Sequence, residues 1–243
     1  MDLSLDLLFL ADTFLRLLTG VPLTLQLAAS SVALGAVLAL LLAAMRRSGL
    51  RWLDWPARFY IFVFRGTPLL VQLFLIYYGL SQFREIRTSF LWPVLRDPTW
   101  CAVIALTLNT AAYGGEIIRG GLASVQRGQM EAARAAGMGR WLLLRRVVLP
   151  LALRQALPAY GNELILMVKA TSLASIITLM EITGIAAKLI AQSYRTVEVF
   201  AVAGAIYLVI NFVLTRLVHA LERRLDPGRP PALAAAIGKG GTA

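Results

Sequence analysis

The sequence predicts an all-α, polytopic membrane protein with about five transmembrane helices. Of its 243 residues, 58% are hydrophobic and only 15% are charged, and the mean hydropathy is +0.71. A soluble domain of this size cannot bury so much apolar surface in one core, so part of its solvent must be lipid. A helix needs about 20 mostly apolar residues to cross a bilayer, and five stretches of the chain reach that length.

The expected spans alternate with short polar connections. The first is uncharged throughout and is followed directly by Arg46 and Arg47, which mark its end. The second carries Arg65 in its first half. In chain order the five expected spans cover residues 22–45, 57–79, 100–121, 155–179 and 198–217.

Two other apolar stretches do not qualify as spans. Residues 3–18 carry Asp6, Asp12 and Arg16 and are typical of an amphipathic helix in the membrane interface. Residues 182–191 are too short to cross and are expected at the surface. The chain therefore divides into an N-terminal interfacial segment outside the membrane, a membrane domain and a cytoplasmic tail that is expected to be disordered, namely residues 1–19, 20–220 and 221–243.

The distribution of Lys and Arg orients the chain. With an odd number of spans, one side of the membrane holds 16 of these residues and the other holds six, which are Arg16, Arg84, Arg87, Arg96, Lys188 and Arg195. The basic side is expected to be cytoplasmic, so the N-terminus lies outside and the C-terminus inside a bacterial inner membrane. The acidic N-terminus does not resemble a cleaved signal peptide.

Composition also excludes several kinds of protein. The formal net charge of +11 suits the inner face of a lipid bilayer better than nucleic acid, because the arginines cluster between apolar runs. One cysteine, Cys101, and one histidine, His219, cannot make a disulfide framework or a Cys/His metal site. Gly238-Lys239 lacks the rest of a P-loop, so no cofactor is expected on this chain and any ATP with its Mg²⁺ must sit on a partner. No enzyme activity is expected.

The polar segment 127–150 is the most distinctive part of the sequence. Residues 130–136 are strong helix formers, and Gly137 and Gly139 can end that helix without strain. Residues 140–148 can resume a helix, which Pro150 is expected to stop. Taken alone, these features are most typical of an ordinary amphipathic cytoplasmic loop. The alternative is that this segment forms a surface to which another protein binds.

The spacing of Glu131-Ala132-Ala133, Gly137, Val147 and Leu149-Pro150 resembles the EAA signature of ABC-importer permeases. We call residues 127–150 the EAA loop. The only departure is Val147 in place of isoleucine. In that family the loop forms a coupling helix seated in a cytoplasmic ATPase. The resemblance therefore implies a type I ABC-importer permease fold with ATPase-docking residues Glu131, Ala132, Ala133, Gly137, Leu149 and Pro150.

Two further segments are similar to one branch of that family. Residues 64–72, Phe-Arg-Gly-Thr-Pro-Leu-Leu-Val-Gln, resemble the second span of permeases for polar amino acids. Residues 161–163 together with 171–173 resemble the fourth span of the same branch. Residues 171–175 and the start of the fifth span are closer to permeases for histidine, arginine and opines. The resemblance covers residues 20–225.

Four charges fall within or near the spans, where they are costly unless they pair or face a cavity. Glu116 and Arg119 are three residues apart, which favours a pair within one helix. Glu163 could line the substrate path, or it could pair with an arginine of another helix. Arg65 is either an interfacial arginine or part of a gate. Lys169 follows Glu163 by six residues, a spacing that does not place two residues on the same helix face.

The remaining polar residues of the spans complete the expected sites. The substrate-path candidates beside Glu163 are Asn162, Asn109, Thr171 and Ser172. A gate or hinge is expected at Arg65, Gly66, Thr67 and Pro68, since Pro68 removes a backbone donor and Gly66 permits a kink.

The implied function is the permease subunit of an ATP-driven importer for a polar, preferably basic, amino acid. The implied partners are two ABC ATPase subunits, a second permease chain and an amino-acid-binding protein outside the membrane. An ion-coupled secondary transporter, with Glu116 or Glu163 carrying a proton, is the alternative, and a membrane anchor for an ATPase is another. The sequence leaves the carried substrate and the choice between homodimer and heterodimer open.

Overall fold

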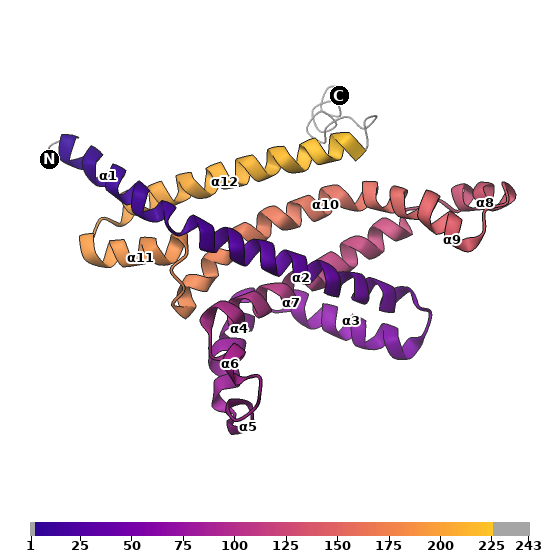
Figure 1. Cartoon of the computed structure of the whole chain (residues 1–243), viewed down its shortest axis with the longest axis horizontal. Helices are drawn as coiled ribbons and strands as arrows, with labels where there is room; N and C mark the ends of the chain where they lie inside the picture. The colour runs from indigo at the N-terminus through magenta and orange to yellow at the C-terminus, as the bar shows by residue number, and fades with distance from the viewer. Residues whose placement is uncertain (1–2, 226–243) are drawn as a thin grey trace, which may run out of the picture.

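A computed structural model of the chain describes residues 3–225, and every regular element in that range is helical. The long helices lie roughly along one axis, with the N-terminus at one end and the EAA loop at the other (Figure 1). The α-helices are α1 (Leu3–Leu18), α2 (Val21–Arg47), α3 (Arg51–Gly66), α4 (Leu69–Phe74), α5 (Arg84–Arg87), α6 (Trp92–Leu95), α7 (Pro98–Ala123), α8 (Arg127–Ala135), α9 (Arg140–Leu143), α10 (Leu149–Ala170), α11 (Ile182–Ser193) and α12 (Thr196–Leu225).

Short π and 3₁₀ turns extend some of these helices. A π turn at Leu75–Gly79 and a 3₁₀ turn at Leu80–Gln82 follow α4. A π turn at Leu144–Val148 joins α9 to α10, and a 3₁₀ turn at Thr171–Ile177 follows α10.

Within residues 3–225, three helical stretches are long and apolar enough to cross a membrane, and there are five if each of two bent helix pairs counts as one span. The straight stretches are Leu7–Arg47, Pro98–Ala123 and Thr196–Leu225. The bent pairs correspond to the expected second and fourth spans. Helix α12 continues to Leu225, so the first residues of the expected tail are helical, and the rest of that tail lies outside the described residues.

Small residues let α2 and α7 lie against each other. Along α2 a small residue recurs every four positions, at Ser31, Gly35 and Ala39. These residues lie beside α7 residues in the same chain order, namely Val103, Thr107, Thr110 and Gly114. The two helices therefore run parallel. A Cβ at Gly114 would lie 3.1 Å from the Cβ of Ala39. Such small-residue stripes are the usual means by which membrane helices approach closely.

Helix α10 runs antiparallel to α7 and in turn supports α12. Gly121 near the end of α7 touches Ala152 at the start of α10, and Thr110 touches Glu163 further along. Gly161 of α10 leaves room for Val218 of α12. As a result the α2–α3 connection, the EAA loop and the C-terminal end of α12 gather at the same end of the bundle, which we call the EAA-loop end.

The opposite end is closed by contacts between α1, α11 and α12. Leu17, Ile182 and Val199 are completely buried together there. The backbone N–H of Ile182 donates to the Thr24 hydroxyl oxygen at 3.4 Å, and a Cβ at Gly20 would lie 2.7 Å from the same nitrogen. One face of α11 is therefore buried against α1 and α12. The last turns of α1 likewise belong to the bundle.

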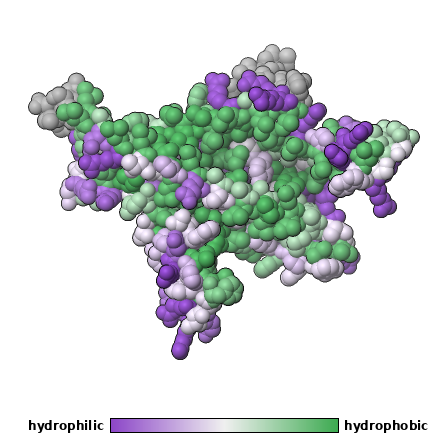
Figure 2. Space-filling model, in the orientation of Figure 1, coloured by the Kyte–Doolittle hydropathy of each residue, from purple (hydrophilic) through white to green (hydrophobic). Residues whose placement is uncertain are grey.

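The surface separates into apolar and polar regions. Hydrophobic side chains cover the middle of the bundle along α2, α10 and α12, whereas hydrophilic ones gather at its two ends and on the arm formed by α4 to α6 (Figure 2). This arm leaves the bundle because α3 and the helical run 69–82 meet at an angle of 105°. The expected second span is thus sharply bent, and the bend lies where a hinge was expected.

Candidate functional site

Helix α8 is ended by a hydrogen-bonded glycine turn. The N–H of Gly137 donates to the carbonyl of Arg134 at 2.9 Å, and the N–H of Met138 donates to the carbonyl of Ala133 at 3.1 Å. This pair of bonds is the Schellman arrangement, which requires a left-handed residue directly after the helix. Gly137 supplies it with φ of +82°. The glycine expected to end the helix therefore does so through its backbone.

A small core fixes α8 to the rest of the chain. Ala133 is buried against Leu143, Val148 and Ala152. Met130 and Met138 pack on the same cluster from either end of α8. The other face, which includes Glu131 and Ala132, is exposed. Helix α8 is thus a short, rigid element that presents a mixed polar and alanine surface away from the bundle.

Pro150 does not stop the preceding helix, contrary to expectation. The helix passes from α9 through the π turn at Leu144–Val148 into α10, and Pro150 occupies the first turn of α10. The N–H of Leu149 donates to the carbonyl of Leu144, five residues back. The wider turn accommodates the missing proline donor, so the EAA loop continues into the membrane without a break. Leu149 is 48% exposed beside it.

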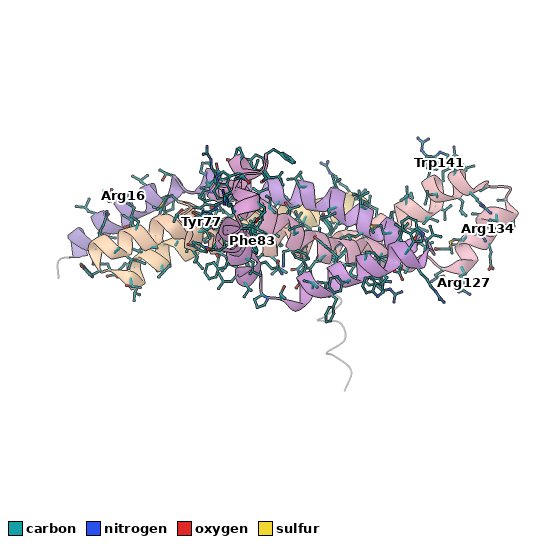
Figure 3. All side chains as sticks on the ribbon, turned by 90° about the horizontal axis from the view of Figure 1, so that it is seen from below. Arg16, Tyr77, Phe83, Arg127, Arg134 and Trp141 are labelled. Atoms are coloured by element: carbon teal, nitrogen blue, oxygen red, sulfur yellow. The ribbon has the colours of Figure 1, made fainter. Side chains whose placement is uncertain are left out.

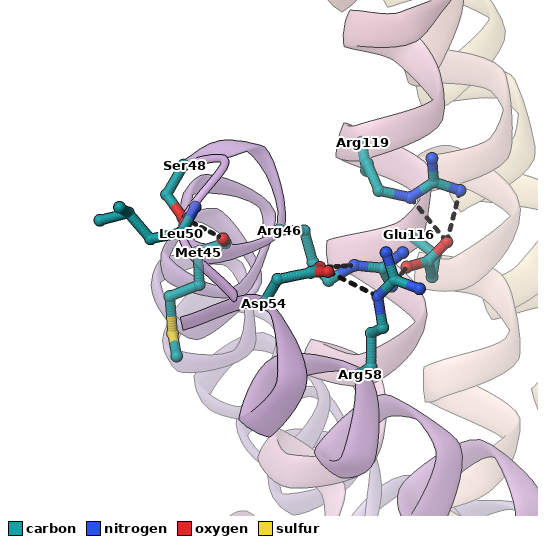
Figure 4. Close-up of polar contacts among 8 residues, drawn as sticks. All are labelled: Met45, Arg46, Ser48, Leu50, Asp54, Arg58, Glu116 and Arg119. Carbon is teal, nitrogen blue, oxygen red and sulfur yellow. Dashed lines mark hydrogen bonds and ion pairs between the residues drawn. The ribbon is translucent and has the colours of Figure 1, made fainter. Parts of the chain in front are cut away.

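Five charged side chains bind α2, α3 and α7 together near the EAA-loop end (Figure 4). Glu116 accepts hydrogen bonds from Arg46 at 2.7 Å and from Arg119 at 2.7 Å, so the expected pair with Arg119 is confirmed. Asp54 lies 2.9 Å from Nε of Arg46, in an ion pair without hydrogen-bond geometry, and 2.7 Å from Arg58. Arg46, Asp54 and Arg58 were not predicted, because pairing between helices depends on their packing.

Replacing Glu116 by alanine is expected to lower stability substantially. Glu116 is 19% exposed, and its loss leaves Arg46, only 16% exposed, without one of its two acidic partners. A hydrogen bond to a charged group contributes about 1.5–3 kcal/mol. The Tm of the purified chain in detergent should fall by roughly 4–8 °C. Arg58→Ala is the control, since this arginine is 63% exposed and should change Tm little. An equal Tm for both variants would contradict the network's role.

The expected hinge at residues 65–68 coincides with the sharp bend. Helix α3 ends at Gly66, Thr67 is extended, and Pro68 precedes α4. The side-chain amide of Gln72 donates to the carbonyls of Phe64 and Thr67 at 2.9 and 3.1 Å. These carbonyls would otherwise lack partners in a lipid environment.

Two side chains of α7 brace the same bend. The amide of Asn109 donates to Oε1 of Gln72 at 3.1 Å and to the Phe64 carbonyl at 3.4 Å. The guanidinium of Arg65 lies 5.1 Å from the ring centre of Tyr113. Asn109, which was expected in the substrate path, therefore serves the bend, and Gln72 was missed because its role depends on the broken helix.

Glu163 is buried at the contact between α7 and α10. It is 8% exposed and accepts a hydrogen bond from the hydroxyl of Thr110 at 3.0 Å. Among the described residues it forms no ion pair with an arginine, so the alternative of a structural pair on a neighbouring helix is not realised.

The other substrate-path candidates do not gather around Glu163. Asn162 and Lys169 are exposed. Thr171 is buried and donates its hydroxyl to the Val168 carbonyl at 2.7 Å, and Ser172 donates to the Lys169 carbonyl at 2.7 Å. These hydroxyls are satisfied by their own helix. Within residues 3–225, Glu163 and Thr110 form one polar pair that the fold places deep in the bundle.

A second buried carboxylate, Glu181, was not singled out from the sequence. It is completely buried and caps α11 by accepting the N–H groups of Thr183 and Gly184 at 2.9 and 2.8 Å. The hydroxyl of Tyr207 donates to it at 2.7 Å. The acidic residue directly before a helical segment was the available signal. Its role is to hold α11 against α12.

Comparison with known proteins matches the geometry described above. Residues 31–227 match the family described as binding-protein-dependent transport system inner membrane component. The octopine transport system permease protein OccM of Rhizobium radiobacter is 67% identical over 224 residues, which cover 92% of this chain and 91% of that protein. The histidine/lysine/arginine/ornithine transport system permease protein HisM of Escherichia coli K12 is 43% identical over 207 residues, 85% of this chain and 87% of HisM.

A solved structure agrees with these relatives. A chain from the crystal structure of an amino acid ABC transporter superposes with a TM-score of 0.79 at 36% identity, covering 92% of this chain and 99% of that one. The expected all-α, type I importer fold is thereby confirmed. The chain belongs to the binding-protein-dependent transport system inner membrane components, the membrane-spanning permease subunits of ABC importers.

Proposed function

We propose that this chain moves a polar amino acid or an opine across the cytoplasmic membrane and that a partner ATPase drives it through α8. The observation that carries the proposal is the exposed face of α8, held rigid by the glycine turn at Gly137 and by the core under Ala133. The chain performs no bond chemistry of its own, and ATP with Mg²⁺ binds to the partner.

The packing beneath α8 supports a route for mechanical coupling. Ala133 shares one buried apolar cluster with Val148 and Ala152, and the helix continues past Pro150 toward Glu163. A displacement of α8 by a closing ATPase dimer therefore moves α10 directly. Nucleotide can shift the transporter between outward- and inward-facing states only through its different affinity for the two.

The assembly we propose contains two ATPase subunits, two permease chains and an external binding protein. A second permease, identical or related, supplies the other half of the pathway, and the EAA-loop end faces the cytoplasm with the N-terminus outside. The similarity to permeases named for octopine and for histidine, lysine, arginine and ornithine favours a substrate with a cationic group. A buried carboxylate such as Glu163 suits such a group.

Reversing the charge at Glu131 tests the docking role of α8. Glu131→Lys adds a fourth positive charge to a surface that already carries Arg127, Arg134 and Arg140, so the ATPase should no longer seat correctly. We expect uptake into reconstituted vesicles to fall at least tenfold while the chain still reaches the membrane. The control is Glu85→Lys on the exposed arm helix α5. Full ATP-driven uptake by the Glu131 variant would disprove docking at this face.

Glu163→Gln tests the substrate path. Glutamine keeps an oxygen that accepts the Thr110 hydroxyl, so assembly should be preserved, but the negative charge is lost. Uptake of a cationic substrate should drop by about tenfold or more, which corresponds to the loss of one charge-assisted contact. Substrate-stimulated ATPase activity and yield of the complex are measured in parallel. Normal uptake, or loss of the complex itself, would refute the assignment.

A further inference from the structure

A pocket of about 480 Å³ lies between the end of α2 and the EAA loop. This volume is within the range of roughly 300–1,000 Å³ that small-molecule sites occupy. It does not include Glu163, nor Glu131 on the exposed face of α8. Its lining combines four arginines with apolar side chains and consists of Arg47, Leu122, Ala123, Val125, Arg127, Met130, Arg134, Arg140, Leu143, Leu144 and Val148.

The four arginines come from three separate segments. Arg47 ends α2, Arg127 and Arg134 belong to α8, and Arg140 begins α9. The lining contains no carboxylate, and within residues 3–225 none of the four forms an ion pair. Four like charges around one pocket repel each other unless an anion lies between them. Guanidinium groups match the geometry of a phosphate better than any other side chain does.

The remaining lining distinguishes between sources of phosphate. Leu122, Met130, Leu143 and Val148 make much of the wall apolar. A free phosphate ion gains nothing from such a wall, because it prefers water or polar groups on every side. An amphiphile with a phosphate next to hydrocarbon satisfies both parts of the lining. This chemistry is that of a phospholipid at the membrane surface.

The position of the pocket agrees with that ligand. Trp52 and Trp55, both 69% exposed, follow Arg47 in the first turns of α3. Exposed tryptophans mark the level of the lipid headgroups. Arg47 therefore reaches the pocket from the headgroup level, while Arg127 and Arg134 reach it from the EAA loop, at the end of the molecule opposite to Arg16 (Figure 3).

We propose that this pocket binds the headgroup of an anionic phospholipid. The phosphate lies among the four arginines, and the glycerol and upper acyl chain contact the apolar wall. The bound lipid joins the end of α2 to the EAA loop and screens the repulsion between Arg47 and Arg140. The pocket does not include Glu163 or Glu131, although it shares Arg127, Arg134 and Arg140 with the surface proposed above to seat the ATPase.

The test is lipid retention by the full-length chain, extracted from membranes in the assembly it forms there and analysed by native mass spectrometry. The probe is phosphatidylglycerol, with phosphatidylcholine and inorganic phosphate as comparison ligands. Each arginine near an anionic lipid contributes about 1 kcal/mol, so Arg47→Gln with Arg140→Gln should weaken phosphatidylglycerol binding about thirtyfold. The matched control is Arg145→Gln with Arg146→Gln, which removes two exposed charges outside the pocket.

Each outcome decides the proposal. Loss of phosphatidylglycerol from the pocket variant, with retention by the control and no phosphatidylcholine bound, supports it. Equal retention by both variants overturns it. Binding of inorganic phosphate without lipid selectivity overturns it in favour of a small-anion site. Unchanged lipid binding with loss of a co-purifying protein overturns it in favour of a protein contact at Arg47 and Arg140.

Discussion

Gly137→Val is expected to abolish ATP-driven uptake while leaving the membrane helices intact. With φ of +82°, Gly137 occupies the left-handed region, where a β-branched residue is strained by about 1–3 kcal/mol. No neighbouring atom lies within 4 Å of a Cβ placed there, so the penalty is purely one of backbone conformation. The turn after α8 would open, and the two hydrogen bonds that Gly137 and Met138 donate would be lost.

The chain provides a matched control two residues away. Gly139 has φ of −66° and ψ of 163°, an extended conformation that valine prefers, and it also has open space around it. Gly139→Val should therefore retain uptake near the wild-type level. Gly137→Asn should recover most activity, since asparagine tolerates the left-handed region. Uptake and ATPase association in reconstituted vesicles measure all three. Similar losses for both valine variants would show that backbone conformation at residue 137 is not what matters.

Gly121→Ala is expected to destabilise the chain although alanine is the better helix former. A Cβ at Gly121 would lie 2.7 Å from the backbone oxygen of Ala152 and 2.8 Å from the Cβ of Ala156. Neither atom belongs to a flexible side chain, so α7 and α10 would have to move apart just where the EAA loop begins. Overpacking of this kind costs about 1–3 kcal/mol.

At the neighbouring Gly120, substitution by alanine is expected to have the opposite effect on stability. Gly120→Ala meets nothing within 4 Å and gains up to about 1 kcal/mol of helix propensity. The Tm of the purified chain should thus rise slightly for Gly120→Ala and fall by several degrees for Gly121→Ala. Uptake should fall only for Gly121→Ala, because the contact between α7 and α10 at Gly121 supports the EAA loop and its helix α8. A fall in Tm for both, or for neither, would mean that α7 and α10 are not closely packed at this point.

The long helices were predictable because their signal is local. Residues 22–45 and 198–217 lie within α2 and α12, since an uninterrupted apolar run can satisfy its backbone in lipid only as a helix. The end of α8 at Gly137 was predictable for the same reason, because a glycine after helix formers is a local signal. The break at Pro68 was also visible, but not its angle of 105°.

Interactions between helices were not predictable in the same way. Arg46 and Asp54 are eight residues apart in the sequence, and nothing local indicates that they pair with each other or that Arg46 also pairs with Glu116. Asn109 looked like a path residue because a polar side chain in a span has few other uses, yet it supports the bend. Pro150 was misjudged because the π turn before it is a tertiary accommodation that carries no signature of its own.

The contact of α1 and the start of α2 with α11 and α12 can form only late in synthesis of the chain. The N–H of Ile182 meets the Thr24 hydroxyl across 158 residues of sequence, and Leu17 is covered by residues of α11 and α12. At a translation rate of about 5–20 residues per second, the first helix waits roughly 10–30 s for these partners. During that interval Thr13 and Leu17 must be sheltered by lipid or by the insertion machinery. A ribosome that stalls before Ile182 therefore leaves a chain whose first helix has no place to dock.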